Sequence, residues 1–247
     1  MKNAILKYIQ KMNIALFLFL LVPGVQAKWS RSNFSGVANL SFQKQAIVFF
    51  DAFFQEIGGR NGAEIIYSKY RYMVKFHLRG SNGKTMSIVT AQEMLSRLGG
   101  THSLVTFKRN FRKIDLDRDG QMSMFEFLVH SSKNPKIALN EFFKKQKDTL
   151  RKFSRGLLSV QTVAYEISDL EKKKKELVKN SQRRGVKGRA AQHELKELKN
   201  SDPLELNRAL VTAEATIRKA TRRHSRTNPG ATWWLQREID EFKRYKP

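Results

Sequence analysis

The stretch KIDLDRDGQMSMFEF, from Lys113 to Phe127, gathers four carboxylates in a chain whose formal net charge is +25. Three aspartates stand at alternate positions, a glycine follows the third, and a glutamate comes near the end. Carboxylates this close repel one another and destabilise a fold unless a positive charge lies among them. The spacing therefore predicts a cation-binding loop.

The side chains of this loop can be read by position, with Asp115 as position 1. The order satisfies D-x-[DN]-x-[DN]-G-x5-E, the pattern of a twelve-residue calcium loop between two helices. Calcium takes six to eight oxygen ligands at roughly 2.3 to 2.6 Å, and Gly120 permits the tight turn that brings them together. The predicted ligands are Asp115, Asp117, Asp119 and Glu126 by their carboxylates, Gln121 by its backbone carbonyl and Ser123 through a water. An acidic helix cap with chance spacing is the alternative.

At every key position the loop resembles the EF-hand calcium-binding family, whose hands are paired by a short backbone contact at loop position 8. That position is Met122 in QMSMFEF, and the same Met-Ser pair stands 36 residues earlier, 122 minus 86, at Met86 in KTMSIVT. In this register positions 1, 3, 5 and 12 of the earlier loop are Arg79, Ser81, Gly83 and Thr90. The resemblance implies a partner loop without an ion and one bound Ca2+. The alternative is an unrelated surface loop.

Apolar residues elsewhere recur at helical spacing, and no segment alternates as a strand does, which predicts an all-α fold. Helices are expected over about residues 41–57, 63–77, 89–98 and 103–114 and from Met124 onward, so that helix, loop and helix occur twice. After Asn134 the composition becomes basic and partly heptad-like, which predicts a helical, coiled-coil-like C-terminal region. A last amphipathic helix is expected in TWWLQREIDEFKRY.

The amino terminus has lysines before an apolar run from Ile14 to Val22 and a small residue, Ala27, after a Pro-Gly break. This order is typical of a secretory signal peptide and predicts a secreted or secretory-pathway protein. An uncleaved anchor or a wrongly assigned start, with a cytoplasmic protein, is the alternative. The predicted organisation is a signal peptide 1–27, a linker 28–40, an EF-hand pair 41–134, a basic helical region 135–227 and a C-terminal helix 228–247.

The composition favours a binding protein over an enzyme. Lys and Arg number 47 against 22 Asp and Glu, which favours polyanionic partners such as nucleic acid, anionic lipid or an acidic protein surface. The chain has no cysteine, so disulfides, thiolate zinc sites and a cysteine nucleophile are excluded. Its five histidines lack ligand spacing, and no set of nucleophile, base and orienting residue is found. We expect no catalysis and no small-molecule substrate.

Beyond the loop, the chain is similar to the slime-mould plasmodial calcium-binding proteins, which join EF-hands to coiled-coil-forming helices. The fragments that carry this resemblance are SRLGGTHSLVTFKRNFRKIDLDRDGQMSMFEFLVH, VKGRAAQHELKELKNSDPLELNRALVTAEATIRKA and TWWLQREIDEF. It implies a calcium-responsive interaction or assembly protein that contacts a protein partner, or itself, through its helical tail. The alternative is a nucleic-acid or anionic-lipid binder in which calcium is only structural.

Overall fold

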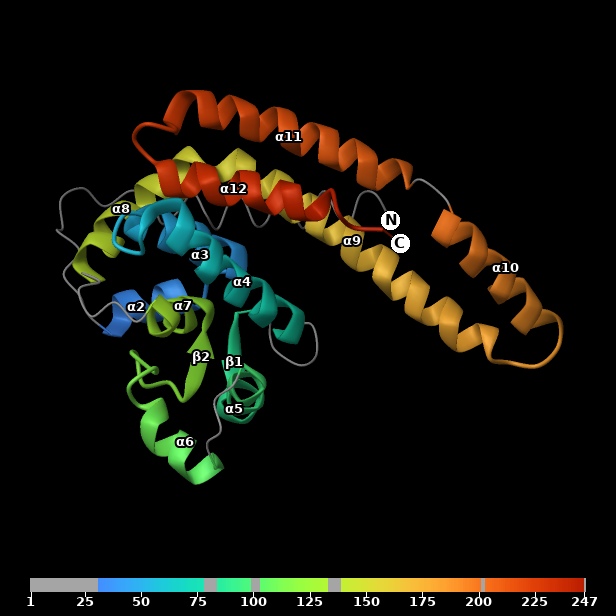
Figure 1. Ribbon diagram of the computed structural model, residues 1–247, viewed down its shortest axis with the longest axis horizontal. Helices are drawn as coiled ribbons and strands as arrows, with labels where there is room; N and C mark the ends of the chain where they lie inside the picture. The colour runs from blue at the N-terminus through green and yellow to red at the C-terminus, as the bar shows by residue number, and fades with distance from the viewer. Residues whose placement is uncertain (1–30, 78–83, 99–102, 133–138, 201–202, 247) are drawn as a thin grey trace.

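The computed structural model describes residues 31–77, 84–98, 103–132, 139–200 and 203–246, and it is helical apart from two short strands (Figure 1). The predicted all-α class is therefore confirmed, whereas the predicted signal peptide lies outside the described residues. The elements are α2 (Arg31–Ala38), α3 (Phe42–Phe53), α4 (Gly59–His77), β1 (Thr85–Ser87), α5 (Ile88–Arg97), α6 (Leu104–Phe111), β2 (Gln121–Ser123), α7 (Met124–Ser132), α8 (Leu139–Lys152), α9 (Ser154–Ser181), α10 (Val186–Asn200), α11 (Leu204–His224) and α12 (Pro229–Phe242).

Helix α3 lies at the centre of the molecule. Its sequence FQKQAIVFFDAF is apolar on nearly every side, and ten of its twelve residues are buried. A helix with apolar residues all round belongs in a core, because no face of it is suited to water. Helices α4, α7, α8, α9 and α12 all pack against it. The loop-bearing part of the chain and the C-terminal helices therefore meet on α3.

Two helix-loop-helix units lie side by side in the first part of the chain. Helices α4 and α5 flank β1, and α6 and α7 flank β2 (Figure 1). The strands pair antiparallel, with Met86 opposite Met122, which confirms the predicted contact and its register. The sequence did not predict strands, since three residues are too few to show alternation and are ordered mainly by pairing with each other.

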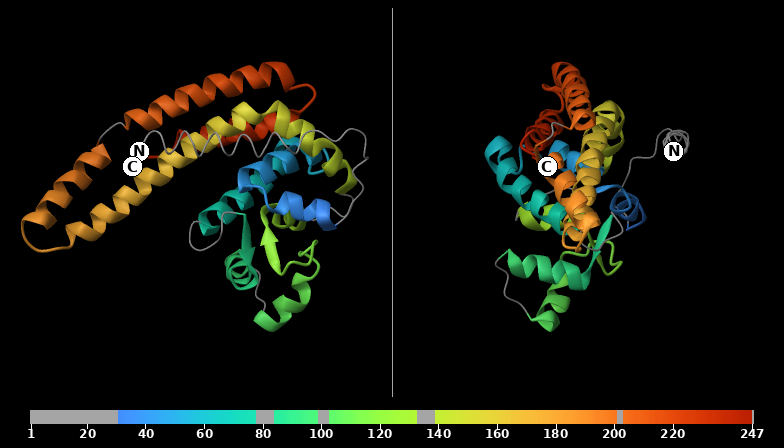
Figure 2. Two further views of the ribbon diagram at one scale, coloured as in Figure 1. Left: turned by 180° about the vertical axis from the view of Figure 1, so that it is seen from behind. Right: turned by 90° about the vertical axis from the view of Figure 1, so that its right-hand side faces the viewer.

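The C-terminal helices form a long, partly extended layer. Helix α9 packs along α11, α10 folds back on the distal half of α9, and α12 lies between α11 and α3. The part of α9 paired with α10 projects from the body as an arm (Figure 2), stabilised by a separate small apolar cluster of Leu177, Ala191 and Leu198. Helix α9 begins at Ser154. Gly156 there permits close approach to Leu235 of α12.

One apolar core extends from Phe34 to Phe242, through both the loop-bearing part and the C-terminal helices. Within the stretch expected as a linker, Arg31–Ala38 form α2, and Phe34 is fully buried with its ring 5.5 Å from that of Phe125. The apolar face of α12 is buried as its periodicity indicated. The proposed domain boundaries stay a prediction.

Candidate metal site

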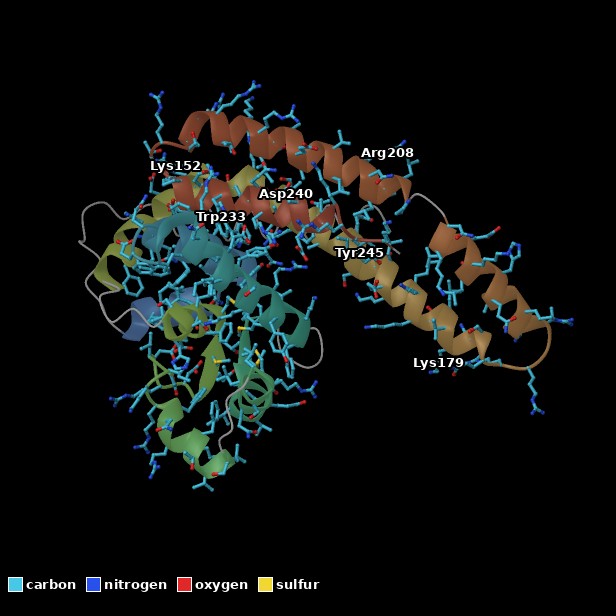
Figure 3. All side chains as sticks on the ribbon, viewed as in Figure 1. Lys152, Lys179, Arg208, Trp233, Asp240 and Tyr245 are labelled. Atoms are coloured by element: carbon cyan, nitrogen blue, oxygen red, sulfur yellow. The ribbon has the colours of Figure 1, made fainter. Side chains whose placement is uncertain are left out.

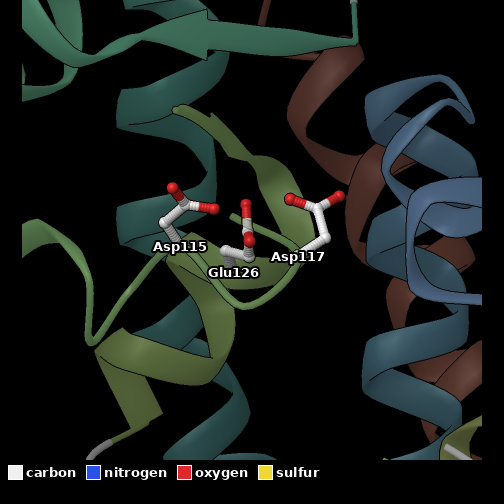
Figure 4. Close-up of side chains that lie close together, drawn as sticks. All are labelled: Asp115, Asp117 and Glu126. Carbon is white, nitrogen blue, oxygen red and sulfur yellow. The ribbon is translucent and has the colours of Figure 1, made fainter. Parts of the chain in front are cut away.

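The predicted calcium loop connects α6 to α7 and brings three carboxylates together (Figure 4). Each of Asp115, Asp117 and Glu126 offers one carboxylate oxygen, and these oxygens lie within 4.8 Å of one another. Asp115 and Glu126 are buried, with 8% and 1% of their surface exposed. The side chains at positions 1, 3 and 12 are thus arranged around one point.

The loop backbone folds around the carboxylate of Asp115. Its Oδ1 accepts a hydrogen bond from the N–H of Asp119 at 3.1 Å, and its Oδ2 accepts one from the N–H of Gly120 at 3.0 Å. Gly120 has a φ of 75°, as its predicted role in the turn requires. Arg118 also has a positive φ, 62°, which costs a residue with a side chain about 1 kcal/mol and which the sequence did not indicate.

Glu126 closes the loop onto α7. Its Oε2 accepts from the backbone N–H of Ser123 at 2.8 Å and from the Ser123 hydroxyl at 2.9 Å, while its Oε1 accepts from the N–H of Leu116 at 2.7 Å. The N–H of Glu126 in turn donates to the oxygen of Ser123 at 3.2 Å. This reciprocal pair is a capping box, so Glu126 stabilises the first turn of the helix while its carboxylate faces the loop.

Three of the six predicted ligands lie outside the group of converging carboxylates: Asp119, Gln121 and Ser123. Asp119 is exposed and is not one of the three converging carboxylates, and its Oδ1 accepts a hydrogen bond from the N–H of Gln121 at 2.7 Å. The side chain of Gln121 accepts from the hydroxyl of Thr85 across the two strands. The hydroxyl of Ser123 donates to Oε2 of Glu126, and the water-mediated role of Ser123 stays a prediction.

The electrostatics of the loop favour a cation. Burial, and to a smaller extent the neighbouring charge of Asp117, raises the pKa of Glu126 to about 8. Burial, and then the charge of Asp119, raise the pKa of Asp117 as well. Asp117 Oδ2 is buried without a hydrogen-bond partner, which a fold avoids unless a ligand satisfies it. Three carboxylates fit a hard divalent ion such as calcium.

The paired loop differs in its chemistry. Its described part runs from Lys84 through β1 to Thr90 and contains no carboxylate, and the residues predicted at its first three ligand positions lie outside the described part of the chain. The hydroxyl of Thr85 donates to Gln121 of the acidic loop. This loop therefore supports its neighbour through strand pairing and a side-chain bond.

One residue beside the site, Gln45 of α3, was not predicted from the sequence. This glutamine is fully buried and bonds to the backbone of α7 and to the residue before β1. The signal available was a polar residue on the buried face of an otherwise apolar helix.

Comparisons with known proteins connect this chain to actin bundling. The family model described as F actin bundling C terminal matches residues 129–239. A calcium-regulated actin-bundling protein of Dictyostelium discoideum is 26% identical over 264 residues, which cover 87% of this chain and 88% of that protein. The crystal structure of a 34 kDa F-actin bundling protein from the same organism aligns with a TM-score of 0.74 at 24% identity and covers 89% of this chain and 99% of that one. At this identity the likeness shows a shared fold.

The matches cover both parts of the molecule. The family model runs from α7 to α12, and the relative described as calcium-regulated aligns over most of the chain. The chain is thus similar to a calcium-regulated actin-bundling protein, which agrees in outline with the calcium-responsive assembly protein that the sequence predicted. The resemblance to the plasmodial calcium-binding proteins stays a prediction. Among the described helices, none has both the length and the apolar composition that a membrane crossing requires.

Proposed function

We propose that this protein binds one calcium ion in the loop Asp115–Glu126 and bundles actin filaments in a calcium-dependent manner. The observation that carries the calcium part is the convergence of Asp115, Asp117 and Glu126 around one point beside a paired loop. The match of residues 129–239 to F actin bundling C terminal and the likeness to a calcium-regulated bundling protein support the actin part.

The contacts of α7 offer a route from the ion to the rest of the fold. Glu126 stands next to Phe125, whose ring lies 4.0 Å from that of Phe142 in α8. Met124, Phe127 and Leu128 of α7 are also fully buried, so rotation of α7 on ion binding would disturb packing inside the protein. Alternatively, the bound ion only stabilises the fold and α7 does not move. Measuring filament bundling with and without calcium distinguishes these two roles of the ion.

The C-terminal helices offer a basic surface for a partner. Side chains of α11 and of the arm point into solvent, including Arg208 and Lys179 (Figure 3). Arg222 and Arg223 of α11 are also exposed and lie in the segment matched by the bundling family. We expect Arg222→Glu/Arg223→Glu to weaken filament binding severalfold and to reduce its salt dependence, while Arg60→Glu on α4 leaves both unchanged. Unchanged binding in the double variant would remove α11 from the filament contact.

Calcium affinity and filament bundling can be measured together on one matched set of variants. Glu126→Gln removes a charged ligand, whereas Glu93→Gln on α5 removes an exposed carboxylate outside the loop. Isothermal titration is expected to give wild type a Kd of about micromolar or weaker, because the net positive charge repels the ion and the paired loop lacks carboxylates. Glu126→Gln should bind at least tenfold more weakly and Glu93→Gln like wild type.

Low-speed sedimentation of actin filaments then tests the response. Wild type and Glu93→Gln should bundle differently in millimolar calcium and in chelator, and Glu126→Gln should behave alike in both. Calcium binding without a change in bundling would assign the ion a purely structural role. Absence of calcium binding in folded wild type would contradict the proposal.

The basic arm favours a second candidate function. Residues at the tip of the arm are exposed and strongly basic: Arg183, Arg184, Lys187 and Arg189. A nucleic-acid or anionic-lipid binder with a structural calcium ion would bind polyanions tightly, with steep salt dependence, equally in wild type and in Glu126→Gln. Binding to anionic vesicles and to nucleic acid in calcium and in chelator distinguishes this function from the first.

Actin bundling also bears on the location of the protein. We propose a cytoplasmic protein, the alternative left open for residues 1–27, because actin filaments lie in that compartment. Mass spectrometry of the protein from its natural source tests this, since a mature N-terminus at Lys28 would favour the secretory pathway.

A further inference from the structure

We infer that Gln45 is a positioning residue of the calcium site although it belongs to neither loop. This inference rests on the proposed calcium function. Gln45 lies in the first part of α3 and none of its surface is exposed. A buried amide in an apolar core is costly unless its donors and its acceptor are all satisfied. Two of the bonds of Gln45 join it to Lys84 and Phe125, one beside each loop.

The carbonyl of the Gln45 side chain holds the start of α7. Its Oε1 accepts a hydrogen bond from the backbone N–H of Phe125 at 2.9 Å. Phe125 is the second residue of α7, where backbone N–H groups have no acceptor within the helix. The next N–H, that of Glu126, donates to Ser123. Two consecutive N–H groups are thus capped, one from within the loop and one from α3.

The amide nitrogen of Gln45 holds the opposite side of the site. Its two N–H groups are shared among three carbonyl oxygens, those of Ala38 at 3.0 Å, Leu40 at 2.7 Å and Lys84 at 3.2 Å from Nε2. Lys84 directly precedes β1 of the paired loop, Ala38 is the last residue of α2, and Leu40 lies in the connection from α2 to α3. One side chain therefore connects α2, the carboxylate-free loop and the helix that carries Glu126.

This arrangement matters for calcium because Glu126 must lie at a fixed distance from Asp115 and Asp117. Calcium–oxygen distances vary by only a few tenths of an ångström, and Glu126 is carried on the first turn of α7. By fixing the N–H of the preceding residue, Gln45 places that turn before the ion arrives. Methionine at position 45 fills a similar volume but can neither accept from Phe125 nor donate to Lys84.

A matched pair of α3 variants tests the inference in the full chain. Gln45→Met removes the bonds, and Gln43→Met makes the same change at a partly exposed position of the same helix. At a temperature where all proteins are folded by circular dichroism, titration calorimetry should show calcium affinity about tenfold weaker in Gln45→Met, the usual effect of one unpaired buried group. Gln43→Met should bind like wild type.

Hydrogen exchange separates positioning from general stability. The Phe125 amide of wild type should exchange as slowly as core amides of α3, and in Gln45→Met it should exchange faster while those amides keep their protection. Fast exchange of Phe125 in wild type overturns the inference even if Gln45→Met fails to fold. Wild-type affinity in folded Gln45→Met also overturns it, whereas lack of calcium binding by wild type overturns the proposed function itself.

Discussion

Met122 of the acidic loop pairs with Met86 of the carboxylate-free loop, and both side chains are fully buried. The pairing gives the loops a common backbone ladder and a common patch of core. A loop without ligands can therefore still affect ion binding, since it fixes the strand that precedes Glu126. Strand pairing therefore gives the carboxylate-free loop a structural role that does not involve binding a second ion.

Replacing Met86 should weaken both the fold and the site. Met86→Ala is expected to cost about 2–4 kcal/mol of unfolding free energy, the usual range for a large-to-small change in a core, and to lower calcium affinity severalfold. Met94→Ala on α5 is the control, because Met94 is equally buried but lies outside the strands. Denaturant unfolding and calorimetry measure the two quantities. Equal loss of affinity in both variants would contradict a specific role for strand pairing.

Replacing Gly120 or Gly36 by alanine should change the stability of the protein in opposite directions. Gly120 has a φ of 75° with open space around it, so Gly120→Ala should cost about 1 kcal/mol from backbone strain alone and weaken calcium binding. Gly36 lies inside α2, where a Cβ meets nothing within 4 Å. Gly36→Ala should stabilise the protein by about 0.5–1 kcal/mol through helix propensity. Thermal unfolding in chelator, followed by calcium titration, checks both signs.

The raised pKa of Glu126 predicts a pH-dependent calcium effect. In the metal-free protein this pKa is about 8, above its ordinary value of 4.5. The stability that the protonated carboxyl contributes is fully present below about pH 4.5 and is lost as the pH rises through about 8. Calcium binding releases this proton, so calcium affinity should increase from pH 6 to pH 8.5. The calcium-induced rise in Tm should grow over the same range.

Glu126→Gln and Glu93→Gln serve as controls for the pH dependence of Tm. Glu126→Gln has no carboxyl to titrate, so in chelator its Tm should fall less than that of wild type between pH 6 and pH 8.5. Glu93→Gln should follow wild type. A calcium-induced Tm shift that is constant over this range would show that Glu126 is already ionised in the metal-free protein.

Glu238 of α12 connects the C-terminal helices to the calcium-loop part of the chain. Its carboxylate is buried and accepts from the hydroxyl of Tyr67 at 2.6 Å and of Tyr70 at 3.5 Å, with Arg71 at 3.8 Å. Glu238→Ala should cost about 3 kcal/mol, because it leaves these groups of α4 unpaired in a buried site. Asp240 accepts an exposed hydrogen bond from Gln236, so Asp240→Ala should lower the free energy of unfolding by less than about 0.5 kcal/mol. Denaturant unfolding compares the free energies of unfolding of the two variants. Similar values would mean that the hydrogen-bond network around Glu238 contributes little to stability.

Several features followed from the sequence because they depend on local spacing. The candidate ligands of the twelve-residue loop occupy fixed positions in one continuous stretch of sequence. The 36-residue interval between Met86 and Met122 predicted which residues of the two loops face each other. Helical periodicity indicated the all-α class and the buried face of α12, since 3.6 residues per turn leave a readable pattern.

Other features required the tertiary structure because they join residues far apart in the chain. No periodicity connects Gln45 with Phe125, or Glu238 with Tyr67, and the position of α2 is decided by the aromatic contacts of Phe34. The structure also decided which carboxylates converge, since those of Asp115, Asp117 and Glu126 come together and that of Asp119 does not. The sequence by itself determined the order of oxygen-bearing side chains in the loop and the helical class, whereas long-range packing determined how α7 is held and how the loop is joined to the C-terminal helices.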